Sequence, residues 1–600
     1  MNNGLALTDY IILAGFFAVM LGIGIAYARR MKNLSDFFSG GGQVPWWLAG
    51  ISLYMTTFSA FTFVSYSALA YQYGFVAVSI WWFSIPGCLL SAWFLAARWR
   101  RAATTSPVEY LETRYNATIR QGFSWFGVPL IVADDALKLF VIGTMITASA
   151  GMTSNEAKTW AIIGCGAIML VYTLLGGLWA VMITDFIQFI VMAVAVLVLV
   201  PLAAAAAGGV LSVLERLPEG YGNVTNATYT WPWLLSFSVI LALTFATKWP
   251  YVQRYYAARS DAEARKVGYT VAVLTVIAPP LLFWPAIAAT QFLPDVADAN
   301  EIYPMICRML LPVGLMGVVL AAMFSATMSM LSSDYNAVAS VITNDIIKRL
   351  FARNASDRAL LLIGRLSTVL VGGLAMILAV ALVYAQELDE LVNIMAQLFA
   401  VLLPPVALPM AAGLLSNRVS GRGAIAGFAA GALLGIGAYA ISYPAVQSAF
   451  AALPGLAWLA PGEDASLAWL RGVQWLTWIT ILPTAAGLAI GSRIWPDSPA
   501  RRAEVDAFLD GLTAAETPGA GQGRPRDGLY ALYIIGMTCA LLGGLMAAAV
   551  LATAPLADAW LTLLVGLLLG AGGALAAWRG KLGMQRLGEG IEPPPADPVP

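Results

Sequence analysis

Histidine is absent from this sequence of 600 residues. Its absence excludes Ser-His-Asp and Cys-His catalysis, imidazole metal sites and histidine pH switches. Charge is also scarce, because Asp, Glu, Lys and Arg make up only 11% of the residues, against about 25% in a typical soluble protein. No nucleophile and base or metal-binding cluster stands out, so an enzyme is the least expected class. The four cysteines lack the spacing of a zinc site or disulfide framework and are expected to be core residues: Cys88, Cys165, Cys307 and Cys539.

Long apolar runs, in contrast, recur from one end of the chain to the other, and 60% of the residues are hydrophobic. A helix of ~20 apolar residues crosses a hydrocarbon core of about 30 Å, so each such run predicts a membrane span. We therefore expect an all-α polytopic protein that lies in the lipid bilayer and has no soluble catalytic domain. Fifteen spans are predicted, near residues 9–29, 45–68, 74–97, 123–151, 158–178, 180–206, 231–250, 268–292, 309–346, 361–385, 389–414, 422–444, 472–491, 528–551 and 556–578.

The distribution of basic residues predicts the orientation of these spans. Most of the 33 Lys and Arg residues fall in alternate loops and at the helix ends beside them, which the positive-inside rule assigns to the cytoplasm. The N-terminus is then expected outside and the C-terminus in the cytoplasm, in a plasma membrane or bacterial inner membrane. The first span has no basic leader or small-residue cleavage site, so it is expected to be retained and not removed as a signal peptide.

The longer loops differ in composition. Residues 207–230 and 444–471 are rich in Gly, Pro, Asn, Thr and Trp and are predicted to be outer loops. Residues 492–527 are charged and rich in Pro and Gly, which predicts a flexible cytoplasmic connector. The end of the chain, IEPPPADPVP, is predicted to be disordered.

Two predicted spans carry clusters of hydroxyl side chains. Polar groups within the bilayer are costly, so such clusters indicate where function lies. Hydroxyl and carbonyl oxygens suit a small hard cation such as sodium. Alternatively, Ser and Thr hydroxyls bond back to their own or neighbouring helices. The second span holds Thr56, Thr57, Ser59, Thr62, Ser65 and Ser67, and the ninth holds Ser325, Thr327, Ser329, Ser332 and Ser333.

Charged residues also occur within the fourth predicted span. Asp134 and Lys138 are four residues apart and can pair on one helix face, with Asp135 beside them. The pair either neutralises itself or leaves Lys138 to meet an anionic substrate.

Three further charges are predicted near the inner surface of the membrane. Asp185 is expected to favour a helix N-terminus, and Lys248 is expected to extend its ammonium to the interface. Counting ~1.5 Å per residue along the ninth span places Asp334 close to the inner surface, as an interfacial or capping carboxylate.

Several ordered motifs, taken together, resemble the sodium:solute symporter family, which includes sodium/glucose, sodium/proline and sodium/sialic-acid transporters. The resemblance runs from about residue 5 to 445. It is carried by DFFSGGGQVPWWLAGISL (36–53), GGLWAVMITDFIQ (176–188), VQRYYAARS (252–260), SATMSMLSS (325–333) with Thr343-Asn344-Asp345, and the pair Pro404-Pro405.

This resemblance implies a five-plus-five inverted-repeat core of the LeuT-like kind, with one helix before the core and four after it. The resulting division is an N-terminal helix and inner loop (1–44), a first repeat of spans 2–6 (45–206), an outer loop (207–230), a second repeat of spans 7–11 (231–414), extra helices 12 and 13 (415–491), the cytoplasmic connector (492–527), a helical hairpin (528–578) and a cytoplasmic tail (579–600).

The resemblance also implies where sodium binds. In that family the cation lies between the broken first core helix and the eighth core helix. The family often has a second hydroxyl directly after the position of Ser325, and this chain has Ala326 there. Asp185 and Ser329 match residues of a second sodium site or of the inner exit path. The implied ligands of the main sodium site are the backbone carbonyls of Met55, Phe58 and Ala322 and the hydroxyls of Ser325 and Thr327.

The substrate-binding positions diverge from the glucose branch. Where the glucose branch has a Gln, this chain has Thr62, and where that branch has a Glu, this chain has Trp81. The Tyr-Trp pair of that branch corresponds to Thr244-Phe245 here. Thr57, Ser59 and Thr62 look closer to the sialic-acid branch, and Lys138 falls where that branch has an Arg for the substrate carboxylate.

We therefore predict a sodium-coupled secondary active symporter that works by alternating access, favouring a carboxylated sugar such as sialic acid. A neutral sugar or another small organic solute is the alternative. A transporter-like sensor acting through a partner docked on the connector is an alternative of another class. Sodium is the only expected ion, with no organic cofactor and no nucleic acid, and the oligomeric state stays open.

Overall fold

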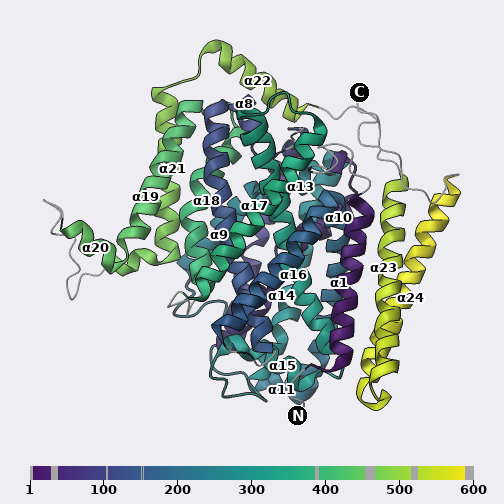
Figure 1. The fold of residues 1–600 in the computed structure, drawn as a ribbon. Coiled ribbons are helices and arrows are strands. Elements are labelled where there is room, and N and C mark those ends of the chain that lie inside the picture. Colours follow the sequence, from purple (N-terminus) through teal and green to yellow (C-terminus); the bar gives the residue numbers. More distant parts are fainter. Residues whose placement is uncertain are drawn as a thin grey trace.

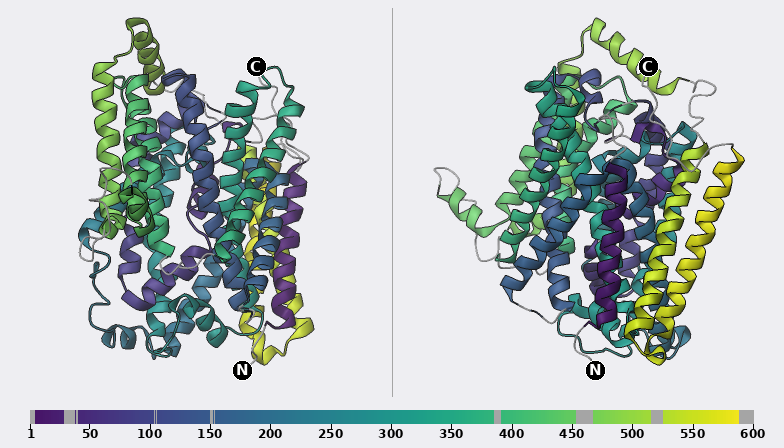
Figure 2. Two further views of the ribbon diagram at one scale, coloured as in Figure 1. Left: turned by 60° about the vertical axis from the view of Figure 1, so that its left-hand side comes forward. Right: turned by 45° about the vertical axis from the view of Figure 1, so that its right-hand side comes forward.

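The computed structural model describes residues 5–28, 38, 40–102, 104, 106–149, 152, 154–384, 391–452, 467–514 and 525–587. Within these ranges the chain is helical, and its β contact is an isolated parallel bridge between Val44 and Ala258. The long helices run roughly side by side between two faces, one carrying α11 and α15 and the other α8 and α22 (Figures 1 and 2).

The first half of the chain forms helices up to residue 215. They are α1 (Leu7–Ala28), α3 (Trp46–Met55), α4 (Ala60–Tyr73), α5 (Val76–Trp82), α6 (Ile85–Leu90), α7 (Ala96–Arg101), α8 (Tyr110–Arg114), α9 (Ala117–Ser149), α10 (Asn155–Ala206) and α11 (Val210–Glu215), with a π-helical turn, Ser91–Leu95, between α6 and α7.

The second half begins at residue 231. Its helices are α12 (Trp231–Thr247), α13 (Trp249–Tyr256), α14 (Asp261–Ala289), α15 (Ile302–Leu310), α16 (Leu315–Val341), α17 (Asp357–Val383), α18 (Leu391–Leu415), α19 (Gly421–Ile441), α20 (Pro444–Ala451), α21 (Val473–Ile494), α22 (Pro499–Thr513), α23 (Pro525–Thr553) and α24 (Leu556–Arg586).

The apolar runs fold as membrane-spanning helices, as predicted. Twelve helices among the described residues are long and apolar enough to cross a bilayer, or up to fourteen when each of two bent pairs forms one span. The remaining predicted span, 123–151, corresponds to α9, which is 33 residues long and carries Asp134, Asp135 and Lys138. The all-α polytopic fold is thus confirmed, whereas the division into domains stays a prediction.

Glycine marks the boundary between the predicted fifth and sixth spans. α10 is continuous for 52 residues but changes direction at Gly177, whose φ of 54° and ψ of −172° lie outside the helical region. A side chain would be strained in this conformation, which only glycine adopts readily. Gly177 therefore fixes the angle between the two arms of α10.

Two spans are broken, one in each half of the chain. α3 and α4 meet at 60° across residues 56–59, and α12 and α13 meet at 47° across Lys248. Ser59 and Lys248 both have extended backbones, so the helical hydrogen bonds are interrupted there. Each break frees backbone groups inside the membrane, which is tolerated only where they are buried in protein or line a cavity.

α16 lies at the centre of the molecule. In its most apolar window 94% of the residues are buried, whereas no other long helix exceeds 61% among the described spans. It packs against α1, α10, α17 and α9 and reaches both arms of the broken α3–α4 pair. A polar residue on α16 therefore faces protein and not lipid.

Two peripheral helix pairs flank this core in Figure 1, α19 with α21 and α23 with α24. Both pairs come together through glycines at which even a methyl group would collide, such as Gly431 against Thr484 and Gly543 against Gly570.

The prediction that residues 492–527 form a flexible connector is wrong over much of their length, because residues 499–513 form α22. Ser498 caps this helix by accepting from the Arg501 N–H, and α22 packs against α7 and α8.

Replacing Gly177 with alanine should destabilise the protein by ~1–3 kcal/mol, since it forces a Cβ into a glycine conformation. Gly164 in the same helix is the matched control, because a Cβ there meets nothing within 4 Å. Thermal unfolding of the purified protein would measure both. Equal unfolding temperatures for Gly177→Ala and Gly164→Ala would contradict the assigned role of Gly177.

Candidate functional site

The two helix breaks meet at a central cavity of about 120 Å³. Its wall is built by α4, α5, α9 and α12 and the two helix breaks, with two residues from α18 and one each from α13, α14 and α16. Every residue that the sequence predicted for substrate binding lines it: Thr57, Ser59, Thr62, Trp81, Lys138, Thr244 and Phe245. Their role in binding stays a prediction, but the structure places all of them together.

Hydroxyl groups on one side of the cavity come from the break between α3 and α4. Thr57 Oγ1 donates to the Tyr54 carbonyl at 2.6 Å, so it retains lone pairs for a ligand. Ser59 and Thr62 form a capping box at the start of α4, which fixes both side chains. The break thus presents three hydroxyls in a defined arrangement.

Aromatic rings form another part of the wall. Trp81 stacks on Phe58 with ring centroids 4.7 Å apart, and Tyr66 packs edge-on against Trp81 at 5.5 Å. The indole Nε1–H of Trp81 is buried without a hydrogen-bond partner. Buried indole N–H groups usually have a partner, so this donor is available to a bound solute.

Charged groups meet at the α9 side of the cavity. Lys138 Nζ lies 2.9 Å from Asp134 Oδ2, 2.9 Å from Asp135 Oδ1 and 2.6 Å from Asp334 Oδ2. Lys248 Nζ lies 3.0 Å from the same oxygen of Asp134. These five residues, which we call the ion cluster, are at most 6% exposed. The predicted pairing of Asp134 with Lys138 is confirmed.

Two placements predicted from the sequence are wrong. Asp334 is fully buried in α16 and not interfacial, because it packs across from α9 and pairs with Lys138. Lys248 does not reach the membrane surface, because the break between α12 and α13 places it beside the rings of Tyr251 and Phe399 and against Asp134. Depth counted along one helix cannot detect partners on another helix.

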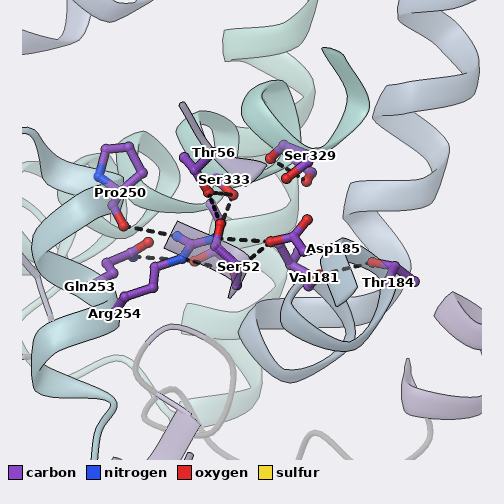
Figure 3. Close-up of polar contacts among 12 residues, drawn as sticks. Ser52, Thr56, Val181, Thr184, Asp185, Pro250, Gln253, Arg254, Ser329 and Ser333 are labelled. Atoms are coloured by element: carbon purple, nitrogen blue, oxygen red, sulfur yellow. Dashed lines mark hydrogen bonds and ion pairs between the residues drawn. The ribbon is translucent and has the colours of Figure 1, made fainter. Parts of the chain in front are cut away.

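A second polar group surrounds Asp185 (Figure 3). Asp185 Oδ2 accepts from Ser52 Oγ at 2.5 Å and lies 3.4 Å from Arg254 Nη2. Arg254 also donates to Ser52 Oγ at 3.1 Å and to Ser333 Oγ at 2.5 Å, and Ser333 Oγ lies 3.3 Å from Thr56 Oγ1. Asp185 is therefore a buried ion-pair partner and not a helix-terminal acid, and the network joins α3, α10, α13 and α16.

Sequence reasoning did not identify Arg254 or Ser52 as part of this network. Both lie in segments that carry the family resemblance, VQRYYAARS and DFFSGGGQVPWWLAGISL. A buried arginine needs a carboxylate nearby, so a search for the partner of Asp185 would have drawn attention to Arg254.

The residues predicted for sodium are all buried, but their oxygens differ in availability. Ser325 Oγ donates to the Ala321 carbonyl at 2.6 Å, a bond back to its own helix. Thr327 Oγ1 accepts from the Ala60 N–H at 2.8 Å and so caps α4. Ser329 Oγ and Asp185 Oδ1, in contrast, are buried and have no hydrogen-bond partner outside their contact with each other. The predicted ligand carbonyls are those of Met55, Phe58 and Ala322, each at most 1% exposed.

Toward the face that carries α11 and α15, a larger cavity of about 570 Å³ continues along α4 and α9. Its lining includes Ser65 and Gln72 of α4, Thr144 of α9 and the segment 297–301. α4 and α9 thus line both cavities at different heights.

Ion pairs lie at the opposite face. Arg120 Nη2 lies 2.5 Å from Asp345 Oδ1, and Arg120 Nη1 lies 2.8 Å from Glu112 Oε2. Glu112 Oε1 also pairs with Arg349 Nη2 at 2.5 Å, and the pKa of Glu112 is lowered chiefly by this hydrogen bond. These contacts join α8, α9 and the π-helical segment Ile342–Lys348 that follows α16.

Comparison with known proteins agrees with this geometry. The sodium:solute symporter family profile matches residues 37–431. The chain is 28% identical over 446 residues to the sodium/sialic acid symporter NanT of Aliivibrio fischeri, covering 70% of this chain and 86% of the relative. It is 26% identical over 475 residues to the sodium/glucose cotransporter of Vibrio parahaemolyticus, covering 72% and 84%.

A solved structure is similar over most of its length. A Na⁺-coupled sialic acid symporter in a substrate-bound, outward-open state superposes with a TM-score of 0.68 at 23% identity, over 82% of this chain and 98% of that one. This match confirms the LeuT-like fold. From the profile match over most of the chain, the protein belongs to the sodium:solute symporter family, whose coupling ion is sodium.

Proposed function

We propose that the protein carries a small organic solute across the membrane together with sodium, and that the solute binds in the central cavity. The observation that supports this most strongly is the convergence of both helix breaks on one cavity beside the Asp185 network. A motion of the two halves of the fold against each other would open that cavity to one face at a time.

The proposed sodium position lies between the broken α3–α4 pair and α16. Ser329 Oγ and Asp185 Oδ1 support it, because these two buried oxygens have no partner except each other and keep lone pairs that an ion would satisfy. The carbonyls of Met55, Phe58 and Ala322 and the hydroxyls of Ser325 and Thr327 belong to the separate main site that the family resemblance implies. Sodium at Ser325 requires its hydroxyl to turn its lone pairs toward the ion while donating to Ala321.

For the solute, we favour a carboxylated sugar of the sialic acid kind, on which the Aliivibrio relative acts. The lysine that would meet the carboxylate is Lys248 and not Lys138. Lys138 directs its ammonium at three carboxylates, whereas Lys248 has one and lies between two aromatic rings at the cavity wall.

A neutral sugar is the second candidate. It is favoured by the rings of Trp81 and Tyr66 at the cavity wall, which suit the apolar faces of a sugar, and by the free indole N–H of Trp81. The Vibrio relative is named for glucose.

We infer transport and not catalysis, because the family and the relatives named above are transporters.

For the orientation, we propose that α11 and α15 face outward and that α8 and α22 face the cytoplasm. The basic residues Arg101, Arg349 and Arg501 lie on the α8 and α22 side, which the positive-inside rule assigns to the cytoplasm. The membrane is proposed to be the cell membrane.

Uptake into proteoliposomes should require a sodium gradient and should be faster with a negative interior, since the field contributes ~2.3 kcal/mol per charge per 100 mV. Radiolabelled sialic acid, glucose, myo-inositol and proline would form the panel. Equal uptake with a proton gradient alone would contradict sodium coupling. Solute binding without any uptake would favour the sensor alternative.

Ser329→Ala should raise the sodium concentration for half-maximal uptake by about 5- to 150-fold, the effect of ~1–3 kcal/mol. Asp185→Asn should also alter sodium dependence. Ser325→Ala is the matched comparison on the same helix. A larger effect of Ser325→Ala than of Ser329→Ala would place the ion one turn further along α16, at the position that the family resemblance implies.

Lys248→Gln should weaken binding of a carboxylated solute by ~1.5–3 kcal/mol, the worth of a charge-assisted hydrogen bond, and leave a neutral sugar unaffected. Lys138→Gln should instead lower thermal stability, because it leaves Asp135 and Asp334 without a cation. Affinity and unfolding temperature measured for both variants separate these roles. If wild type and Lys248→Gln bound a carboxylated solute equally well, Lys248 would not bind its carboxylate, and a neutral sugar would be the favoured solute.

Gly222 and Gly511 provide a test of orientation. A side chain at either position meets nothing within 4 Å, and the described native cysteines are buried. A membrane-impermeant maleimide should label Gly222→Cys in intact cells and Gly511→Cys only after permeabilisation. The reverse pattern would show that the orientation is inverted.

A further inference from the structure

The ion cluster carries an unbalanced charge. Three carboxylates face two ammonium groups, so the fully ionised cluster has a formal charge of −1. The neighbouring Asp185 and Arg254 neutralise each other, and the nearby Tyr251 and Tyr335 are neutral phenols, so they do not supply the missing positive charge. An uncompensated charge buried in the bilayer is costly, which predicts one more monovalent cation in the cluster.

The unsatisfied atoms show where this cation belongs. Asp135 Oδ2 and Asp334 Oδ1 are both buried without a hydrogen-bond partner, and both residues are 0% exposed. Their other carboxylate oxygens accept from Lys138, and the carboxylates of the cluster approach within 4.8 Å of one another. Asp134 differs, because Lys138 and Lys248 both contact its Oδ2.

The geometry also limits the size of the cation. The centre of the three carboxylates is occupied by the Lys138 ammonium, which directs its three N–H groups at them. The described lining of the central cavity includes Asp134, Lys138 and Lys248 but neither Asp135 nor Asp334. A solute ammonium or a sodium ion arriving through that cavity therefore does not reach the free oxygens.

The short approach of the two acids indicates that the missing cation is a proton. The carboxylate oxygens of Asp135 and Asp334 approach within 4.8 Å of each other. Two ionised carboxylates have no donor between them, whereas a carboxyl and a carboxylate form a strong, charge-assisted O–H···O hydrogen bond. One proton therefore satisfies the contact, neutralises the cluster and fits the space.

We propose that Asp135 and Asp334 bind one proton between them, which makes the interface of α9 and α16 a protonation site separate from the sodium site. The proton forms an O–H bond to one carboxylate and donates a hydrogen bond to the other. The assignment does not depend on which solute is carried.

Infrared spectroscopy of the purified protein in lipid tests this directly, because a protonated carboxyl has a C=O stretching band that a carboxylate lacks. Wild type should show such a band, shifted in D₂O, and Asp135→Asn or Asp334→Asn should lose one component of it. Asparagine has nearly the shape of the protonated acid and is neutral, so both variants are expected to fold. Glu112→Gln is the control and should leave the band unchanged, because Arg349 and Arg120 keep Glu112 ionised.

Absence of the band in wild type, or its full retention in both Asp135→Asn and Asp334→Asn, would overturn the proposal. Loss in only one variant would support it and assign the proton to that residue. Should neither variant fold, wild-type protein labelled with carbon-13 aspartate shows without a mutation whether the band comes from an aspartic acid at all. A band that shifts with the label supports an aspartic acid, and a band that does not shift overturns the assignment.

Discussion

The cost of burying charge in a membrane is the constraint on which the core depends. Three carboxylates, two lysines and the Asp185–Arg254 pair all lie within the helical core, where each unpaired charge would cost several kcal/mol. Pairing them requires α9, α10, α13 and α16 to stay in register with one another. The same contacts place Asp134, Lys138 and Lys248 at the wall of the central cavity, so the ionic network that holds the core also shapes the site.

The broken helices add the second requirement of the site, which is free polar groups at membrane depth. A continuous α3–α4 helix would satisfy its own carbonyls and direct Thr57 and Ser59 elsewhere. The break at residues 56–59 instead exposes these groups to α16, whose Thr327 caps the second arm through the Ala60 N–H. Sodium between these elements would connect the two arms to α16, which is how an ion can influence a solute bound on the other side of the break.

Much of this architecture could be predicted from the sequence. Runs of ~20 apolar residues located the spans, because hydrophobic length is a local property. The hydroxyl clusters and the position of Lys138 indicated the cavity wall, and the structure brings those residues together. Pairing between distant segments could not be read in this way. Asp334 and Lys248 were placed at the interface because each was judged along its own helix, while their partners lie on α9. The helix α22 was missed because Pro and Gly at its flanks masked the helical segment between them.

We propose that sodium beside Asp185 and solute in the cavity are energetically coupled through the α3–α4 break and α16. Solute affinity measured in detergent with and without sodium tests it most directly, in wild type and in Asp185→Asn. Sodium should tighten solute binding in wild type, solute should tighten sodium binding by the same factor, and both effects should be largely lost in the variant. The same sodium-dependent change in solute affinity in Asp185→Asn as in wild type would contradict the account.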